Sequence, residues 1–349
     1  MIDALTQRFP ALATLGPRHY VVGGAIRDLL LGRDPADADV ACDDPLAAAQ
    51  TVGPRVIRLG DQEHLSAYRV VLPGHVYDFA ELLDHDIAAD LARRDFTVNA
   101  MAVDLASGEL LDPHGGQRDI EARLVRMVDA SNFDDDPLRV LKGVRMAVKY
   151  GFDLEEETLA AMRARAATIT SVAVERVTYE LSVIFSSGVL RRAVALLRET
   201  GLAAPLGLHA RDLHADDVTV AGAYALLVDE PRAYARKWRW SAELLRDVQA
   251  LQGLIEQHDR VDLYDAGEGV ARQLPAVLRA LGRDATLDFP DFSIRALLSG
   301  DAIATLAGLA PGKEVGQLKR ALLEAQLHGE ITNAEEAERF VRTKVERWA

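Results

Sequence analysis

The sequence has a single cysteine, Cys42, among its 349 residues. One cysteine cannot form an internal disulfide, and it excludes a zinc site built on a cluster of cysteine ligands. The chain also lacks an N-terminal secretion signal and any long run of apolar residues. We therefore expect a cytoplasmic protein that makes no use of a membrane.

The sequence has fewer basic than acidic residues: 40 lysines and arginines and 54 aspartates and glutamates, which give a net charge of -14. Proteins that bind nucleic acids normally neutralise phosphates with lysine and arginine, so this balance argues against a general polyanion binder and leaves room only for a local basic surface. Apolar residues are plentiful at 49%. The chain can therefore bury a large core, in two or more domains or in a long multi-helical body.

The first 127 residues mix short β-like runs with helices, whereas nearly every segment from Asp134 onward has helical periodicity. The expected strands are 20–22, 39–41, 56–59, 68–72, 76–79 and 124–128. The expected helices include 137–150, 155–166, 173–185 and 189–200. We predict an α+β protein with a small N-terminal α/β head followed by an extended all-helical region.

The most informative stretch runs from Val22 to Ala41. Gly23 and Gly24 follow an expected strand and open an expected helix that carries Arg27 in its first turn. Glycines let backbone amides approach phosphate oxygens, the helix N-terminus adds positive potential, and an arginine donates as a fork. Asp37 and Asp39 lie two residues apart on a strand and point to one side, as ligands of Mg²⁺ do. Together these features predict a nucleotidyl-transfer site for a triphosphate and its metal ions.

A third carboxylate, Asp78, lies on a second expected strand. A site with two metal ions needs several anionic oxygens, and Asp78 is a candidate to bridge them. The alternative is an ordinary exposed strand residue. The nearby run of Asp84, His85, Asp86 and Asp90 has irregular spacing, and we interpret it as a solvated loop.

Two arginines, Arg93 and Arg94, come just before an expected helix capped by Asp95 or Thr97. Alone, this pattern is typical of a capped helix with surface arginines. Beside the upstream glycines and carboxylates, Arg94 becomes a candidate to neutralise phosphate charge. Asn99 is then a candidate to contact the sugar or a backbone group.

The helix expected after Pro137 has Asp136 in the N-cap position and an apolar stripe on one side. Basic residues recur every three or four positions on another face: Arg139, Lys142, Arg145 and Lys149. Such a stripe is most often a solvated face. Here it begins beside a carboxylate, and one aspartate with one arginine can read a base edge. Asp136 and Arg139 are therefore candidates to select cytosine without a nucleic-acid template.

In combination these motifs resemble the bacterial-type (class II) tRNA nucleotidyltransferases, a family that includes bacterial poly(A) polymerases and belongs to the DNA polymerase β superfamily. Residues 22–41 resemble its catalytic motif, 93–102 its sugar and phosphate motif, and 135–145 its amino-acid template for the incoming base. Residues 174–181 are similar to a helix of its neck, and 308–333 to its tail. The resemblance implies four domains: a catalytic head (1–127), a base-selecting neck (128–207), a body (208–285) and a tRNA-binding tail (286–349).

The resemblance also implies roles for individual residues. Asp37 and Asp39 match the metal ligands, with Asp78 as the third acid. The remaining matches are substrate contacts: Gly23, Gly24, Arg27, Arg94, Asn99, Asp136, Arg139, Lys142 and Arg145. Lys142 departs from the family, which usually has arginine there, and a lysine keeps the charge but loses the fork.

A second departure lies between Asp78 and Arg93, where only the short stretch 80–92 is present. Family members that add the full CCA end usually carry a longer, flexible, charged loop there, and a shorter loop is associated with enzymes that add only the two cytidines. We therefore expect CTP and tRNA as substrates, Mg²⁺ as cofactor, and a separate enzyme that adds the terminal adenosine. A mobile element would be needed to reshape the base pocket from cytosine to adenine.

Three other functions stay open: full CCA addition with CTP and ATP, a poly(A) polymerase, and an inactive RNA-binding relative. The helical region is expected to contact the acceptor arm of tRNA by shape and through phosphates. Two basic clusters are candidates for this contact or for solvated faces: Arg232, Arg236, Lys237 and Arg239, and Lys313, Lys319 and Arg320. Trp238 and Trp240 are more often core anchors than RNA-stacking residues.

Overall fold

The structure is a computed structural model that describes residues 1–59 and 67–346. Residues 60–66 of the predicted head and 347–349 of the predicted tail lie outside the described residues. The chain divides into two compact units, one of residues 1–187 with 192–210 and one of residues 188–191 with 211–349. The predicted head and the predicted neck, except for residues 188–191, thus fall into one unit, and the division into four domains stays a prediction.

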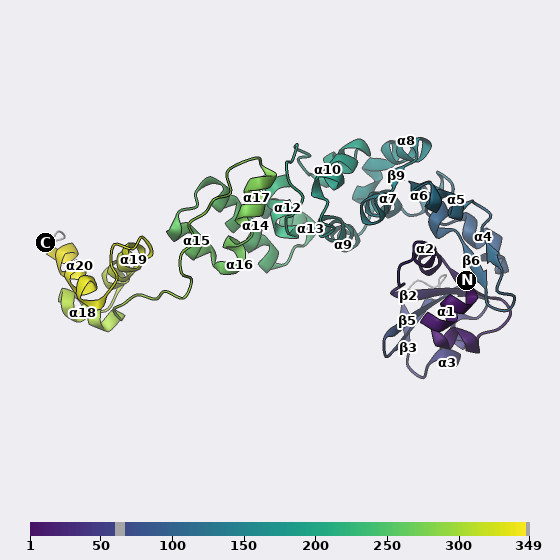
Figure 1. Cartoon of the computed structure of the whole chain (residues 1–349), viewed down its shortest axis with the longest axis horizontal. Helices are drawn as coiled ribbons and strands as arrows, with labels where there is room; N and C mark the ends of the chain where they lie inside the picture. Colours follow the sequence, from purple (N-terminus) through teal and green to yellow (C-terminus); the bar gives the residue numbers. More distant parts are fainter. Residues whose placement is uncertain (60–66, 347–349) are drawn as a thin grey trace. The chain divides into compact units, whose positions relative to one another are not determined.

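Within the described residues, the first unit contains a seven-stranded sheet in the order β3-β4-β5-β2-β1-β6-β7. Strands β2 and β5 run parallel, while the other neighbours are antiparallel. In Figure 1, β2, β5 and β3 are labelled in the order in which they follow one another across the sheet, at the purple and blue end of the chain, with β4 between β5 and β3. The strands are β1 (His19–Val22), β2 (Asp37–Cys42), β3 (Val56–Leu59), β4 (Ala67–Leu72), β5 (His75–Glu81), β6 (Ala102–Asp104) and β7 (Leu110–Leu111). The sequence predicted the first five of these.

Alternating side chains give the sheet two different faces. In β5, Tyr77 and Phe79 are fully buried, whereas Asp78 between them is half-buried. Helix α3 (Pro45–Val52) packs on the buried face, and the residue after it, Gly53, comes so close that a Cβ there would lie 2.6 Å from Val70. The buried face is therefore the core of the head, and the acid-bearing face is left for the site.

Two expectations for the head were wrong. The helix expected after Arg94 is only a single turn of 3-10 helix (Thr97–Asn99), followed by β6. Its sequence is compatible with a helix, but pairing of β6 with β1 extends the chain. The strand expected at 124–128 is reduced to β8 (Leu124–Val125), which pairs with β9 (Asp153–Leu154) in a separate small sheet.

Helices account for nearly all of the remaining regular structure, as predicted. The helices of the first unit are α1 (Ile2–Arg8), α2 (Gly24–Leu30), α3, α4 (Ile87–Ala92), α5 (Gly116–Glu121), α6 (Asn132–Asp135), α7 (Leu138–Tyr150), α8 (Glu156–Arg165), α9 (Val174–Phe185) and α11 (Ala203–Leu206). Helix α10 (Leu190–Glu199) begins in the second unit and continues in the first. Further 3-10 turns are Pro10–Thr14, Leu83–His85 and Ala166–Ser171.

The second unit is helical throughout its described regular structure. It contains α12 (Val220–Leu227), α13 (Pro231–Trp238), α14 (Ala242–Glu256), α15 (Arg260–Ala266), α16 (Glu268–Ala271), α17 (Leu274–Ala280), α18 (Gly300–Ala307), α19 (Lys313–Leu327) and α20 (Ala334–Glu346). Its C-terminal helices share a core of their own, in which Ile303, Leu322 and Val341 are fully buried. Trp238 is buried against Tyr234, so it is a core anchor as expected.

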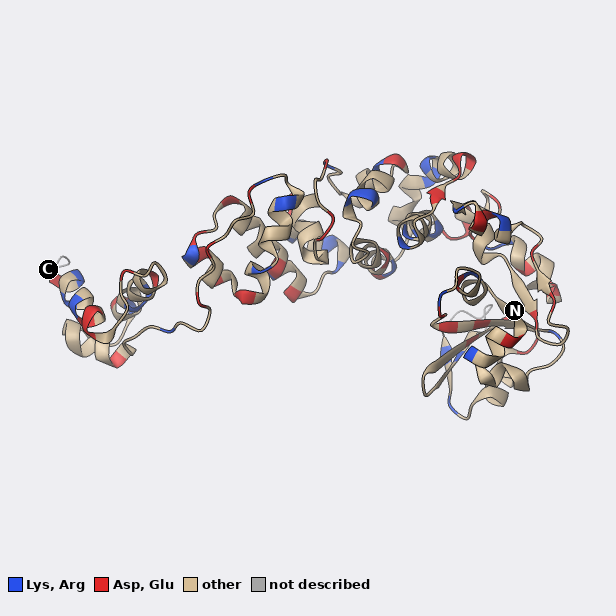
Figure 2. Cartoon of the chain, in the orientation of Figure 1, with Lys and Arg blue, Asp and Glu red and all other residues tan. Residues whose placement is uncertain are grey.

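Basic and acidic residues are interspersed over the helices of both units (Figure 2). On α13, Arg232, Arg236 and Lys237 are exposed. In the second expected basic cluster, Arg320 is bound to two acids, Asp265 and Glu324. Its charge is therefore largely committed within the protein.

In the part of the chain that the structure describes, no helix combines the length and the apolar character needed to cross a bilayer.

Candidate active site

The predicted metal ligands lie together on the acid-bearing face of the sheet. Asp37 and Asp39 are alternate residues of β2, and Asp78 of β5 is the cross-strand partner of Asp39. The pKa of Asp39 is raised to about 6, first by burial and then by the neighbouring carboxylates of Asp37 and Asp78, against an opposing effect of Arg94. A cation bound at these carboxylates would offset both the burial of the Asp39 charge and the repulsion from its neighbours.

The donor set fits a hard divalent cation. Magnesium is usually bound by one or two carboxylates and completes its shell with waters and substrate phosphates. Among the described residues no group of three His, Cys, Asp or Glu side chains is arranged to hold a metal ion, so a carboxylate pair is what this chain offers. Asp78 is already engaged, because Nε and Nη2 of Arg69 on β4 lie 2.7 and 2.6 Å from its two carboxylate oxygens.

The turn between β1 and α2 accepts only glycine at its first position. Gly23 has φ of +74°, a conformation that side chains rarely adopt. A Cβ on Gly23 would lie 2.9 Å from Nη1 of Arg94 and 3.9 Å from Oδ2 of Asp39. The turn thus brings bare backbone against the predicted phosphate arginine and the predicted metal ligand.

Arg27, predicted to face the phosphates, is buried on α2 and bound within the protein. Its Nη1 donates to Asn99, its Nη2 donates to the hydroxyl of Tyr150 at 2.6 Å, and its Nε donates to Asp28 at 2.9 Å. Asn99 in turn donates to Asp95 at 2.9 Å. Each guanidinium nitrogen of Arg27 has a partner here, so its contact with a triphosphate stays a prediction.

The acidic run after Asp78 was predicted to be a solvated loop, and for Asp90 this is wrong. Asp84, His85 and Asp86 are exposed, but Asp90 on α4 is 1% exposed. Its Oδ1 accepts from Nη2 of Arg93 at 2.7 Å, and its Oδ2 from Nη2 of Arg94 at 2.9 Å. Burial alone would raise the Asp90 pKa, but the two guanidinium groups outweigh it and the pKa is lowered. Its spacing of three and four residues from two arginines at the C-terminal end of α4 was the available signal.

The predicted base-reading residues lie at the start of α7. Asp136 was predicted as the N-cap of this helix, but the helix begins one residue later than expected and its N-cap is Pro137. Asp136 instead precedes the N-cap and accepts a hydrogen bond from the backbone N–H of Leu138 at 3.2 Å. Nη1 of Arg139 donates to the backbone oxygens of Arg93 and Asn132 at 2.7 and 2.9 Å. Arg139 is therefore fixed to the segment that also carries Arg94.

Helix α9 supports these residues from the side. Nη2 of Arg176 lies 2.9 Å from Oδ2 of Asp136, and Nε of Arg145 lies 2.9 Å from Oε2 of Glu180. Glu180 is buried, and this burial raises its pKa despite the nearby positive charges of Arg145 and Lys142. Arg176 and Glu180 were not predicted as site residues, and their local sequence gives no sign that they meet α7.

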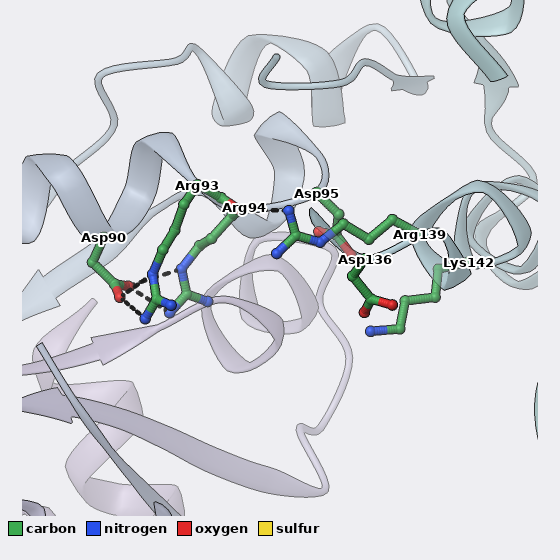
Figure 3. Close-up of a pocket in the computed structure, with 7 residues that line it drawn as sticks. All are labelled: Asp90, Arg93, Arg94, Asp95, Asp136, Arg139 and Lys142. Atoms are coloured by element: carbon green, nitrogen blue, oxygen red, sulfur yellow. Dashed lines mark hydrogen bonds and ion pairs between the residues drawn. The ribbon is translucent and has the colours of Figure 1, made fainter. Parts of the chain in front are cut away.

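Two adjoining cavities bring most of the predicted residues together. The first, of about 240 Å³, is lined by Asp90, Arg93, Arg94, Asp95, Asp136, Arg139 and Lys142. Figure 3 shows Asp90 with its two arginines at one end of this cavity and Asp136 and Lys142 at the other. The second, of about 530 Å³, includes Gly23, Gly24, Arg27, Asp37, Asp39, Arg94, Asn99, Lys142 and Arg145 in its lining.

Arg94, Asp95 and Lys142 line both cavities and join them. Asp78 is the one predicted site residue that lines neither cavity. The site therefore joins a carboxylate pair, a glycine turn, several cations and an aspartate–arginine pair on α7.

The chain is similar to known proteins in sequence and in fold. Residues 19–82 and 63–126 match the family described as the poly A polymerase head domain, and residues 151–210 match that described as a probable RNA and SrmB-binding site of polymerase A. A CC-adding tRNA nucleotidyltransferase of Geobacter sulfurreducens is 30% identical, with 99% of this chain and 97% of that one covered. The chain belongs to the class II tRNA nucleotidyltransferase and poly(A) polymerase family.

Other members of the family differ in the nucleotide they add. An A-adding tRNA nucleotidyltransferase of Deinococcus radiodurans is 31% identical over 98% of each chain. The crystal structure of the Bacillus stearothermophilus CCA-adding enzyme in complex with CTP is 25% identical, with a TM-score of 0.78 over 99% of this chain and 98% of that one. Nucleotidyl transfer to tRNA is common to these relatives, whereas the choice of nucleotide is not.

Proposed function

We propose that this tRNA nucleotidyltransferase transfers cytidylate from CTP to the 3′ end of tRNA, stops after two additions, and leaves the terminal adenosine to a separate enzyme. The observation that carries this proposal is the stretch 80–92, which joins the Asp78 strand to the arginines of the site. It is short, and it is folded along its length into the end of β5, a 3-10 turn and α4.

The contacts of this stretch tie it to the sheet. Leu82 and Leu91 are 2% and 1% exposed, in one apolar cluster. The backbone N–H of Leu82 donates to the oxygen of Cys42 at 2.9 Å, and Asp43 accepts from His85 at 2.9 Å and also from Arg18. An enzyme that changes its base pocket from cytosine to adenine needs an element that moves. A stretch anchored in this way supports a pocket with one shape, suited to cytosine.

In the proposed complex Asp136 accepts a hydrogen bond from the exocyclic amine of cytosine, and Arg139 donates to its ring nitrogen and carbonyl. A good bidentate base contact gives about 1–3 kcal/mol of discrimination against the wrong base. Uracil would leave the Asp136 carboxylate without its donor, which adds to its rejection.

Asp37 and Asp39 are the proposed ligands of Mg²⁺, which when bound would neutralise triphosphate charge and make the RNA hydroxyl more acidic. Gly23 and Gly24 present backbone to the triphosphate, and Arg94 and Lys142, which line the second cavity, supply positive charge. In the transfer, the 3′-hydroxyl oxygen loses its proton and bonds to the α-phosphorus of CTP. The bond to the bridging oxygen breaks, and pyrophosphate leaves.

The deciding experiment incubates purified protein with tRNA that lacks its 3′ end, once with CTP and once with CTP and ATP. We expect two added nucleotides in both reactions. A third nucleotide that appears only with ATP would establish full CCA addition and contradict the restriction to cytidine.

The metal assignment has its own test. Replacement of both Asp37 and Asp39 by alanine is expected to abolish incorporation while tRNA binding, measured by gel shift, stays intact. Activity that survives this double change would show that other groups bind the metal.

A poly(A) polymerase is the second candidate, favoured by the descriptions of the two matching families. The same reactions test it, because a polymerase would add long A tails to generic RNA with ATP alone. We expect no such tails.

A further inference from the structure

The acid-bearing face of the sheet continues past the carboxylates onto the outer strands. Ile57, Arg69, Asp78 and Asp39 are successive cross-strand partners on β3, β4, β5 and β2. Directly paired residues point to the same face of a sheet, so these four side chains form one row across it. On the same face, Val71 and Val76 form a second row that ends at Asp37.

Only part of this face is covered. At β1, β6 and the end of β2, Leu82 and Leu91 pack against Val22 and Ala102 of the sheet. On the outer strands, by contrast, Val71 is 54% exposed and Ile57 is 44% exposed. These are two of the few large apolar side chains so exposed among the described residues. Strand β4 is nevertheless packed into the core, because Val70, on the opposite face of this strand, is fully buried.

Arg69 lies between the apolar residues and the carboxylates. It binds both oxygens of Asp78, yet 40% of its side chain is exposed, and no partner of its Nη1 is found among the described residues. The exposed surface made by Ile57, Arg69 and Val71, here called the acceptor surface, thus combines apolar area with one cation, in a protein of net charge -14.

Phosphoryl transfer places the attacking and leaving oxygens roughly in line, on opposite sides of the phosphorus. The second cavity, with Gly23 and Arg94, lies on the β1 side of Asp39, and it is the proposed triphosphate site. Asp78 and Arg69 lie on the other side of Asp39 in the row. The attacking hydroxyl must therefore reach the carboxylates from the side of the outer strands.

We propose that the acceptor surface binds the 3′-terminal nucleotide of the RNA, with its base or sugar against Ile57 and Val71 and its backbone phosphate at Arg69. This inference rests on the proposed function, since it requires an RNA substrate. Single-stranded RNA is bound where bases pack on exposed side chains, most often aromatic rings or guanidinium planes, and phosphates meet cations. Here exposed aliphatic side chains, Ile57 and Val71, supply the packing area beside the guanidinium of Arg69. Arg69 also orients Asp78, so it is a positioning residue as well as a contact.

The test distinguishes binding of the RNA from binding of CTP by measuring KM for each substrate. The variants are Arg69→Gln, Val71→Glu and Ile57→Ser, assayed with tRNA lacking its 3′ end and with CTP. For Arg69→Gln and Val71→Glu we expect KM for the RNA to rise about tenfold or more, because a phosphate contact is lost or a like charge is added. Ile57→Ser is expected to give a smaller rise in the same direction. KM for CTP should change by less than about twofold, because no contact to the triphosphate is removed.

Two matched controls use exposed residues elsewhere on the head. Arg58 is the residue after Ile57 in β3, and its side chain points to the opposite face of the sheet, so Arg58→Gln removes a cation outside the acceptor surface. Leu46→Ser removes an exposed apolar side chain from α3. Both should leave both KM values unchanged. An unchanged KM for RNA in Arg69→Gln and Val71→Glu, or a rise in KM for CTP alone, would overturn the acceptor surface.

A second measurement does not depend on turnover. RNA with 4-thiouridine as its 3′-terminal nucleotide is crosslinked to the wild-type protein, and the modified peptide is identified by mass spectrometry. We expect the crosslink in β3 or β4, and a crosslink in α7 would overturn the proposal. Absence of any CTP incorporation by the wild-type protein would contradict the proposed function instead, and the crosslink would still decide where the RNA end lies.

Discussion

The carboxylate of Asp90 binds Arg94 through one oxygen, at 2.9 Å, and Arg93 through the other, at 2.7 Å. Arg94 reaches the glycine turn at Gly23, and the backbone oxygen of Arg93 accepts from Arg139. One buried acid therefore fixes the segment on which the predicted phosphate contact and the predicted base contact both depend. A change at Asp90 is therefore expected to affect the lining of both cavities of the site.

Replacement of Asp90 by asparagine is expected to raise KM for CTP about tenfold, because Arg94 loses the charge that orients it. The same change should lower the free energy of unfolding by about 2–3 kcal/mol, since hydrogen bonds to charged groups are lost in a buried position. Steady-state kinetics and urea unfolding measure the two effects. Asp86→Asn is the matched control on the same helix, because asparagine caps a helix as well as aspartate does. A loss of stability with unchanged KM would reduce Asp90 to a structural role.

Gly23→Ala is expected to destabilise the protein by about 1–3 kcal/mol, because φ of +74° is strained for alanine. Its Cβ would also displace Arg94, so CTP binding should weaken, which isothermal calorimetry can detect. Gly253→Ala on α14 is the control. No atom lies within 4 Å of a Cβ there, and alanine inside a helix should stabilise by roughly 0.5–1 kcal/mol. Wild-type CTP affinity in Gly23→Ala would contradict the close approach at this turn.

Asp39→Asn should be inactive but more stable than the wild type when divalent cations are removed. The pKa of Asp39 is raised to about 6, so the folded state disfavours its charged form, and its contribution to stability falls as pH rises from about 4 to 6. At pH 7.5 the variant should gain at most about 3 kcal/mol in unfolding free energy, and at pH 5 roughly half of that. Urea unfolding in EDTA at both pH values checks the sign. Equal gains at the two pH values would show that Asp39 does not titrate in this range.

Added magnesium should reverse the order of stability of the wild type and Asp39→Asn. Added Mg²⁺ is expected to stabilise the wild type and not Asp39→Asn, because a bound ligand stabilises only the state that binds it. The stabilisation should weaken below pH 6, where a proton competes with the metal for Asp39. Thermal melts with and without Mg²⁺ provide the measurement. Equal stabilisation of both proteins would place the metal elsewhere.

Arg176→Ala is expected to lower the preference for CTP over UTP by up to about fivefold, because a partly exposed ion pair contributes at most about 1 kcal/mol. The variant loses the guanidinium group whose Nη2 lies 2.9 Å from Oδ2 of Asp136 and orients this carboxylate. Competition between the two nucleotides measures it. Arg191→Ala removes a similarly exposed pair with Asp216, at 2.8 Å in the second unit, and should leave the preference unchanged. An equal effect of the two variants would argue against orientation of Asp136 by Arg176.

Local patterns predicted what local interactions determine. The alternation around Asp37 and Asp39 indicated a strand, and the periodicity after Pro137 indicated a helix; both are present as β2 and α7. The helix predicted within residues 95–102 was wrong, because this segment leads into β6. Strand β6 forms by pairing with β1, whose residues lie about eighty positions earlier in the chain.

The sequence by itself determined which chemical groups this protein has and the order in which they occur: a glycine turn, a carboxylate pair, an arginine segment and an aspartate–arginine pair opening a helix. Only the tertiary structure decided which of them meet. It buried Asp90 between two arginines, paired Asp78 with Arg69, and aligned Ile57, Arg69, Asp78 and Asp39 across four strands. Burial and cross-strand register depend on residues distant in the chain, so local sequence does not determine them, even where the spacing of Asp90 from two arginines indicates a pairing.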